Sequence, residues 1–149
     1  MDLLAKYLHN NLYMNIATVD SNGQPWNTPV FFAHRDKKLH WFSRSNSVHS
    51  TNIASNPKVF ITMYDSTLQE GEGAGLYLLA KAYVLQDQTD LRAGIDVYNE
   101  KAKQYKISEE FLSPSAPNKL YCSEVEQAWV NDSGSSKGDY VDVRTELKL

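Results

Sequence analysis

Apolar residues near the start of the chain first follow a helical spacing and then alternate with polar ones. Leu3, Leu4, Tyr7 and Leu8 recur on one helical face, which predicts a short opening helix. Residues 13–20 show the period-two pattern of a strand. The Asn22-Gly23 pair that follows tolerates positive φ, so it predicts a tight turn into the next extended segment.

Further extended segments follow at short intervals. Residues 26–34 and 39–43 flank a polar turn at 35–38, and we expect them to form an antiparallel meander with the first strand. Residues 59–64 and 75–85 predict two more strands. Residues 120–130 and 140–147 predict a closing hairpin. The chain therefore has about seven expected strands, which dominate its first half and its end.

Two further helical patterns interrupt the strands. Val48, Ile53 and Ala54 predict a helix of one to two turns that ends before Pro57. The other helix begins after Asp87, and the apolar residues that we place on one face of it are Leu91, Ile95, Tyr98, Ala102 and Tyr105. Strands with a few peripheral helices predict a mainly β fold. We expect a small antiparallel barrel, and we expect it to form a single domain over residues 1–149.

Composition and charge exclude several classes of protein. The 149 residues fit one domain, and 42% hydrophobic with 22% charged residues is typical of a folded protein. No apolar run approaches the roughly 20 residues that span a bilayer, so we expect no membrane partner. The net charge is −3 and the 15 Lys and Arg residues are scattered, which argues against nucleic acid.

Cysteine and histidine usage narrows the chemistry further. Cys122 is the only cysteine, so an intramolecular disulfide and a zinc site of paired cysteines are both excluded, and a cytoplasmic location is expected. His34 and His40 lie on neighbouring expected strands, but no acidic residue shares their spacing, so we predict no metal. The sequence contains no nucleophile elbow, Walker loop or dinucleotide glycine motif, and we assign no catalytic residue.

The most informative stretch is residues 40–52, where a strand ends and a helix begins among hydroxyls, amides, Arg44 and His49. Free backbone N–H groups and the helix dipole favour an anion at such a junction. The guanidinium of Arg44 can donate two parallel hydrogen bonds to a phosphate. The plainer interpretation is that Asn46 or Ser47 caps the helix and that the other hydroxyls are solvated.

Several segments, in their order and spacing, resemble the pyridoxamine 5′-phosphate oxidase-like family of FMN-binding split barrels. The matching pieces are MNIATVD at 14–20 with NGQP at 22–25, PVFF at 29–32, LHWFS at 39–43 with Ser47, NPKV at 56–59 and GLYLLAKA at 75–82. The resemblance covers residues 12–85. It implies a split β-barrel, a homodimer and FMN held in a groove at the dimer interface.

The resemblance also implies the cofactor contacts. In the family, one strand runs along the isoalloxazine, and a strand end with the following helix start holds the ribityl phosphate. Arg44 is added on physical grounds, since it offers a charge beside that helix start. The other expected FMN contacts are Asn27, Thr28, Pro29, Val30, Phe42, Ser43, Ser47, Val48 and His49.

The chain also departs from the oxidase. Asn27, Phe32, Val48 and His49 stand where the oxidase has phosphate-directed cations, and Gly75 stands where it has a flavin-contacting Gln. The substrate-binding Arg and His near the oxidase C-terminus have no match in residues 140–149. We therefore do not expect vitamin B6 oxidation. The small general-stress and uncharacterised flavin-binding members are the closer comparison.

The leading hypothesis is a homodimeric FMN-dependent oxidoreductase that acts on an unidentified small-molecule substrate or electron donor. Flavin chemistry would then come from the cofactor, and the protein would position it. Two alternatives remain open. The same barrel could store or sense a flavin, a haem or another ligand without turnover, or it could use the deazaflavin F420 in place of FMN.

Overall fold

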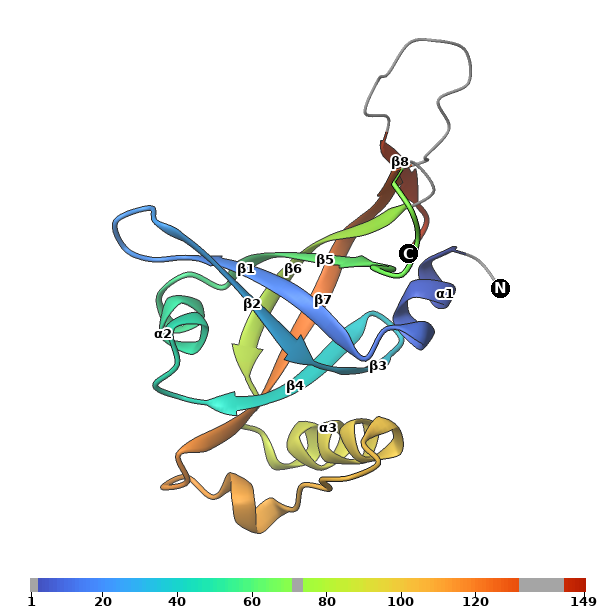
Figure 1. The fold of residues 1–149 in the computed structure, drawn as a ribbon. Coiled ribbons are helices and arrows are strands. Elements are labelled where there is room, and N and C mark those ends of the chain that lie inside the picture. The colour runs from blue at the N-terminus through green and yellow to red at the C-terminus, as the bar shows by residue number, and fades with distance from the viewer. Residues whose placement is uncertain (1–2, 71–73, 132–143) are drawn as a thin grey trace, which may run out of the picture.

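The described residues, 3–70, 74–131 and 144–149 of this computed structural model, form one curled antiparallel sheet with helices at its ends and on one face (Figure 1). In chain order the elements are α1 (Leu3–Asn10), β1 (Tyr13–Val19), β2 (Pro25–Phe31), β3 (Ala33–Arg35), β4 (Lys38–Arg44), α2 (Val48–Ser55), β5 (Lys58–Tyr64), β6 (Gly75–Val84), α3 (Gln88–Lys101), the 3₁₀ turn η1 (Glu109–Leu112), β7 (Asn118–Asn131) and β8 (Arg144–Leu147). The mainly β fold that the sequence predicts is confirmed.

The strand order explains why the barrel is split. The sheet runs β2-β1-β5-β6-β7-β4-β3, and β8 pairs with β7. Its two edge strands, β2 and β3, are consecutive in the chain and are separated only by Phe32, which is fully buried. The sheet therefore curls until its edges approach, and one residue bridges the gap between them. No backbone pairing closes that gap within the described residues.

The expected meander of the first three strands is confirmed only in part, because Ala33 and His34 pair with His40 and Leu39, whereas residues 26–31 do not pair with residues 39–43. β1 and β2 do form a hairpin around Gly23, whose φ is +81°. β4, however, pairs with β3 and β7 and not with β2. The sequence pattern predicts one continuous strand over residues 26–34. In the structure the chain crosses at Phe32 from one edge strand of the sheet, β2, to the other edge strand, β3. A period-two pattern does not reveal this change, because both sides of the break remain extended.

The interior of the sheet follows the alternation of the strands. Met14 and Ile16 of β1 lie opposite Val30 and Thr28 of β2, and all four side chains face inward. Trp41 of β4 stacks on Tyr121 of β7 with 5.5 Å between ring centres. Other members of this core are Leu8, Leu39, Ile53, Val59, Ile61, Met63, Leu76, Leu78, Ala128 and Val130.

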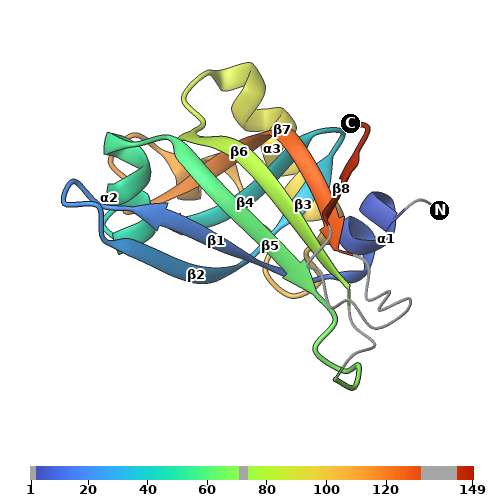
Figure 2. The same ribbon diagram turned by 90° about the horizontal axis from the view of Figure 1, so that it is seen from above.

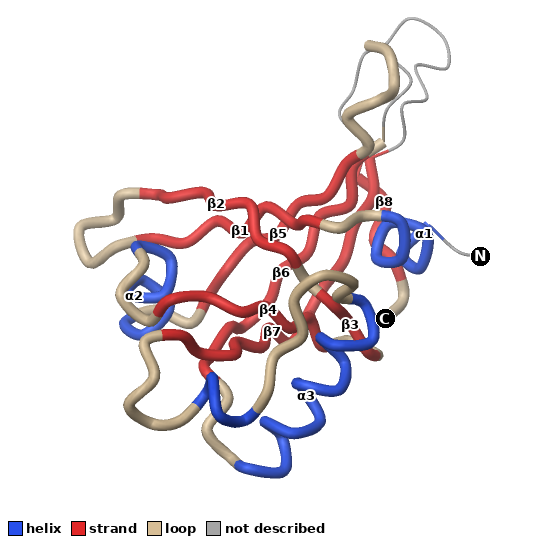
Figure 3. Tube along the Cα trace, turned by 60° about the horizontal axis from the view of Figure 1, so that its bottom comes forward, coloured by secondary structure: helices blue, strands red, loops and turns tan. Residues whose placement is uncertain are grey.

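α3 packs on the outer face of the sheet, across β3, β4 and β7 (Figures 1 and 3). The backbone of α3 lies close to the sheet at Gly94. A Cβ atom at this position would lie 2.7 Å from Leu85 Cδ1 and 2.9 Å from Leu120 Cδ2. The helix ends at Lys101, earlier than the sequence predicts. Tyr105 therefore does not lie on its buried face and is 81% exposed, which corrects that expectation.

The other helices lie at the ends of the barrel (Figure 2). α2 lies against β1, where Asn52 donates a buried hydrogen bond of 3.0 Å to Thr18 Oγ1. α1 is tied to α3 by Lys101, whose Nζ donates to the carbonyl of Asn11 at 2.5 Å. The expected closing hairpin is confirmed for β7 and β8, while residues 140–143 of its second strand lie outside the described residues.

Candidate functional site

The site that the sequence predicts lies where β4 ends and α2 begins. Arg44 is the last residue of β4, and Ser47 is the N-cap of α2, with φ −69° and ψ 156°. The Ser47 hydroxyl accepts a hydrogen bond from the Ser50 backbone N–H at 3.4 Å. Ser47 therefore caps the helix and Asn46 does not. The capping interpretation is correct for this residue, but the other polar groups do more than face solvent.

Three predicted residues meet in one hydrogen-bonded group, which we call the Ser43–His49 cluster and which also includes Ser50. His49 Nε2 lies 2.9 Å from Ser43 Oγ and 3.2 Å from Ser47 Oγ. The Ser47 hydroxyl also contacts Ser50 Oγ at 2.8 Å and the Arg44 carbonyl at 2.9 Å. The cluster links the end of β4 to the first turn of α2, so the tertiary fold fixes the imidazole.

The imidazole of His49 is almost completely buried, with 7% of the residue exposed. Burial lowers the pKa of His49, because the charged ring loses hydration. No charged neighbour contributes to this shift. The ring is therefore neutral at pH 7, and the two serine hydroxyls satisfy its Nε2.

Several donors at this junction have no acceptor in the described part of the chain. The capping bonds use the N–H groups of Ser50 and Thr51, which leaves those of Val48 and His49 free. The Arg44 side chain is exposed and has no carboxylate partner among the described residues. Free N–H groups at a helix start, hydroxyls and one guanidinium form a donor set that suits an anion such as a phosphate ester.

β2 contributes a second element to the site, because it is an edge strand. Among the described strands it pairs with β1 alone, so its other side keeps backbone groups that none of these strands occupies. Asn27 and Pro29 are exposed on its outer face, whereas Thr28 and Val30 face the interior. Thr28 Oγ1 is buried without a hydrogen-bond partner in the described residues.

Phe42 joins the site to the core beneath α3. Its ring packs near that of Tyr98, with centroids 6.4 Å apart, and Tyr98 also makes an edge contact with Phe31 at 5.4 Å. Tyr98 thus holds β2 and β4 together across the gap in the barrel. The sequence places Tyr98 on the apolar face of the helix, and this helical spacing gives no signal for the bridging contact. Ser50 was also missed, although its spacing from the N-cap Ser47 is typical of a capping partner.

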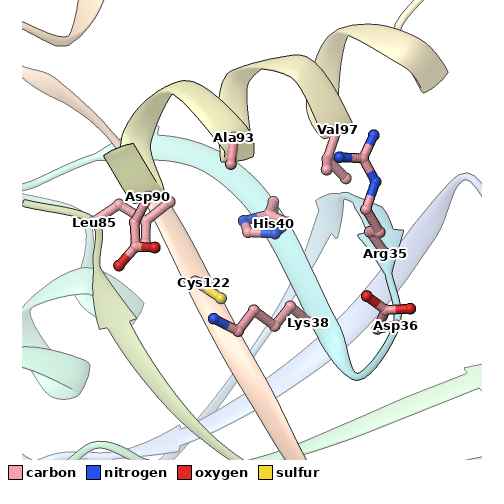
Figure 4. A pocket seen from close by; sticks show the side chains of 9 residues that line it. All are labelled: Arg35, Asp36, Lys38, His40, Leu85, Asp90, Ala93, Val97 and Cys122. Carbon is pink, nitrogen blue, oxygen red and sulfur yellow. The ribbon is translucent and has the colours of Figure 1, made fainter. Parts of the chain in front are cut away.

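A separate pocket of about 110 Å³ lies under α3 and contains none of the ten predicted residues (Figure 4). His40 lies at its centre, 5% exposed, and burial lowers its pKa to about 4. Cys122 lines the same pocket, and burial raises its pKa to about 11, so its thiol is protonated and a poor nucleophile. The described residues contain no cluster of three side chains that could hold a metal, and His34 and His40 are therefore not part of one.

Comparison with known proteins identifies the family. The model of the pyridoxamine 5′-phosphate oxidase family matches residues 2–131, so the chain belongs to this family. Its fold is the split barrel of this family. No curated protein matches the sequence. None of the described helices has the length and apolar character that crossing a membrane requires.

Solved structures share the fold at low sequence identity. The haem storage protein HutZ of Vibrio cholerae is 21% identical with a TM-score of 0.70, and the match covers 85% of this chain and 91% of HutZ. An FAD-binding protein of Mesorhizobium loti is 19% identical with a TM-score of 0.67, over 87% and 94% of the two chains. Campylobacter jejuni ChuZ is 15% identical with a TM-score of 0.71, over 86% of this chain and 53% of ChuZ.

Proposed function

We propose that this protein binds FMN as a homodimer and acts as a flavin-dependent oxidoreductase on an unidentified small-molecule substrate or electron donor in the cytoplasm. The observation that carries the proposal is the junction of β4 and α2. There the Ser43–His49 cluster, two free backbone N–H groups and Arg44 lie together. This donor set fits the phosphate of FMN by its chemistry.

The chain's own residues have distinct tasks in this proposal. Ser43, Arg44 and the first turn of α2 bind the phosphate, while the free side of β2 offers backbone groups to the edge of the isoalloxazine. Val30 and Phe42 provide apolar surface that excludes water. When bound, the flavin supplies the hydride or electron transfer. Vitamin B6 oxidation is not part of the proposal, because the substrate-binding residues of the oxidase have no match here.

The outer face of the sheet supports the homodimer. Ala17, Phe60 and Leu79 lie side by side across β1, β5 and β6 and point away from the core. No described helix lies across this face (Figure 2). Exposure of this apolar row to water is unfavourable. We therefore propose that a second copy of the chain covers it. The second copy would also complete the flavin groove, of which one chain offers a part.

The first experiment is an absorbance spectrum of the purified protein, followed by mass spectrometry of any released ligand. We expect flavin bands near those of free FMN and release of FMN on denaturation. For protein purified without ligand, we expect added FMN to raise the melting temperature, because a ligand that binds only the native state stabilises it. Protein that stays colourless and shows no thermal shift with FMN would contradict the proposal.

A second candidate function is binding without turnover, and the small number of cations near the site favours it. Among the described residues, the junction has Arg44 and, opposite Ser43 on β7, Lys119, whose Nζ donates to the carbonyls of Ser113 and Pro114, where the oxidase has several phosphate-directed cations. The match to a haem storage protein makes haem a ligand to test, and F420 is another. A haem would give an intense Soret band in the same spectrum. For bound flavin, reduction by NADH or NADPH followed by reoxidation by an acceptor would favour the enzyme.

A further inference from the structure

The phosphate site of this chain has fewer fixed charges than a doubly charged phosphate ester requires. Arg44 offers one positive charge, and the remaining donors are neutral hydroxyls and backbone N–H groups. A phosphate monoester has a second pKa of about 6 and carries close to two negative charges at pH 7. Binding it here would leave part of that charge uncompensated unless another group becomes positive.

His49 is the side chain that is placed to supply this charge. It is the only ionisable residue of α2, and its Nε2 is held by Ser43 and Ser47. Its Nδ1 has no partner among the described residues, yet it is not one of the buried polar atoms without a partner, so it reaches the solvent. An otherwise buried imidazole thus presents one free nitrogen beside two unused backbone donors.

The serine partners are compatible with either protonation state. A hydroxyl both donates and accepts, so Ser43 can donate to a neutral Nε2 or accept from a protonated one without moving its oxygen. Protonation of the ring would therefore require only rotation of hydroxyl hydrogens. A fixed carbonyl or carboxylate partner would instead have favoured one state.

The elements packed around α2 do not supply the missing charge to the ring. β2 has no ionisable side chain, and β1 has only Tyr13 at its far end. The ionisable residues on β4 are Lys38, His40 and Arg44, and those on β6 are Tyr77, Lys81 and Tyr83. On β7, Lys119 lies opposite Ser43, but its Nζ donates to the carbonyls of Ser113 and Pro114. None of them contributes to the lowered pKa of His49, which has burial as its cause.

We propose that His49 binds the phosphate of FMN as an imidazolium, so that binding of FMN takes up a proton from solution. The inference rests on the proposed FMN site. It makes His49 a residue that distinguishes phosphorylated from unphosphorylated flavins. Since the complex binds more protons than the free protein, FMN affinity falls as the pH rises. The fall is about tenfold per pH unit between the pKa of His49 in the free protein and its value in the complex.

Calorimetry tests this inference directly. FMN is titrated into the full chain at pH 7 in two phosphate-free buffers of different ionisation enthalpy, and the difference in heat gives the number of protons taken up. The same titration is made with His49→Gln, which keeps a hydrogen-bonding amide but cannot carry the charge. His9→Gln is the matched control, because His9 is an exposed histidine on α1. Riboflavin, which lacks the phosphate, is the ligand control.

We expect wild type and His9→Gln to take up the same fraction of a proton with FMN, up to about one. The uptake by His49→Gln should be smaller by the fraction of a proton that His49 binds, and the FMN affinity of this variant should depend less on pH. Equal uptake by wild type and His49→Gln would overturn the inference and leave FMN binding intact. Failure of the wild type to bind FMN would overturn the proposed function as well.

Nuclear magnetic resonance provides a second measurement that needs no variant at position 49. The imidazole of His49 is titrated in wild-type protein with and without saturating FMN. We expect its pKa to rise on binding FMN and to remain unchanged with riboflavin. An unchanged pKa in the FMN complex would overturn the inference even if His49→Gln does not fold.

Discussion

The imidazole Nε2 of His49 in α2 lies 2.9 Å from the hydroxyl of Ser43 in β4, so that a strand end and a helix start share one hydrogen bond. Ser43 and Ser47 have different roles at this junction. Ser47 caps the helix, whereas the Ser43 hydroxyl makes no capping bond, and its side-chain hydrogen bond within the described residues is the one to the imidazole. Substitutions at the two serines should therefore differ in what they change.

Ser43→Ala should weaken FMN binding by about tenfold or more, because a hydrogen bond to a charged group contributes about 1.5–3 kcal/mol. The free energy of unfolding should change little, since Ser43 is not part of the helix cap. Ser47→Ala should weaken binding and also lower the free energy of unfolding by about 1 kcal/mol. Urea unfolding and FMN titration measure the two effects. Ser55→Ala, at the far end of α2, is the control, and FMN affinity unchanged in Ser43→Ala would place the phosphate elsewhere.

Phe60→Glu should convert the proposed dimer into a monomer and lower its affinity for FMN. Phe60 lies between Ala17 and Leu79 on the outer face of the sheet, and a buried unpaired carboxylate there would oppose association. Light scattering after size-exclusion chromatography gives the mass. Tyr105→Glu serves as the control because Tyr105 is already 81% exposed. A wild type that is monomeric at micromolar concentration contradicts the dimer itself.

Acidification from pH 6.5 to pH 4 should lower the free energy of unfolding, in part through His40. Its pKa is about 4 in the folded protein and 6.5 in the unfolded chain, so the unfolded chain binds more protons in this interval. The contribution of His40 is roughly 3 kcal/mol at most. It is fully present above pH 6.5 and is lost as the pH falls through 4.

Urea unfolding at several pH values checks this dependence, with His40→Gln compared with wild type. The variant should lose less stability on acidification, while the lowered pKa values of His34 and His49 preserve part of the trend. His9→Gln should behave as wild type. Parallel curves for His40→Gln and wild type would show that burial does not keep this imidazole neutral.

Gly94→Ala should destabilise the protein by about 1–3 kcal/mol, although alanine is the better helix former. The new Cβ would lie 2.7 Å from Leu85 Cδ1 and 2.9 Å from Leu120 Cδ2. These are ends of flexible side chains, but both leucines are packed in the cluster beneath α3 and have little room to move. Chemical denaturation measures the change. A variant as stable as wild type would show that this cluster adjusts without cost.

The sequence predicted the local elements well because each depends on a short pattern. The alternation in residues 13–20, the Asn22-Gly23 turn and the start of α3 at Asp87 are all found in the structure. The helical spacing predicts that α3 continues to Tyr105, whereas the helix ends at Lys101 and Tyr105 is 81% exposed. The ten site residues remain predictions as FMN contacts. The structure brings Ser43, Ser47 and His49 into direct contact.

The sequence by itself determined a mainly β domain, its hairpins and a polar junction at the start of α2, because these follow from neighbouring residues. Only the tertiary structure decided the strand order, the change of edge at Phe32 and the burial of His49 and His40. Each of these depends on residues that are distant in the chain but adjacent in space, such as the Phe31–Tyr98 contact across the gap. The pKa of a histidine depends on what surrounds it, so its charge is a property of the fold.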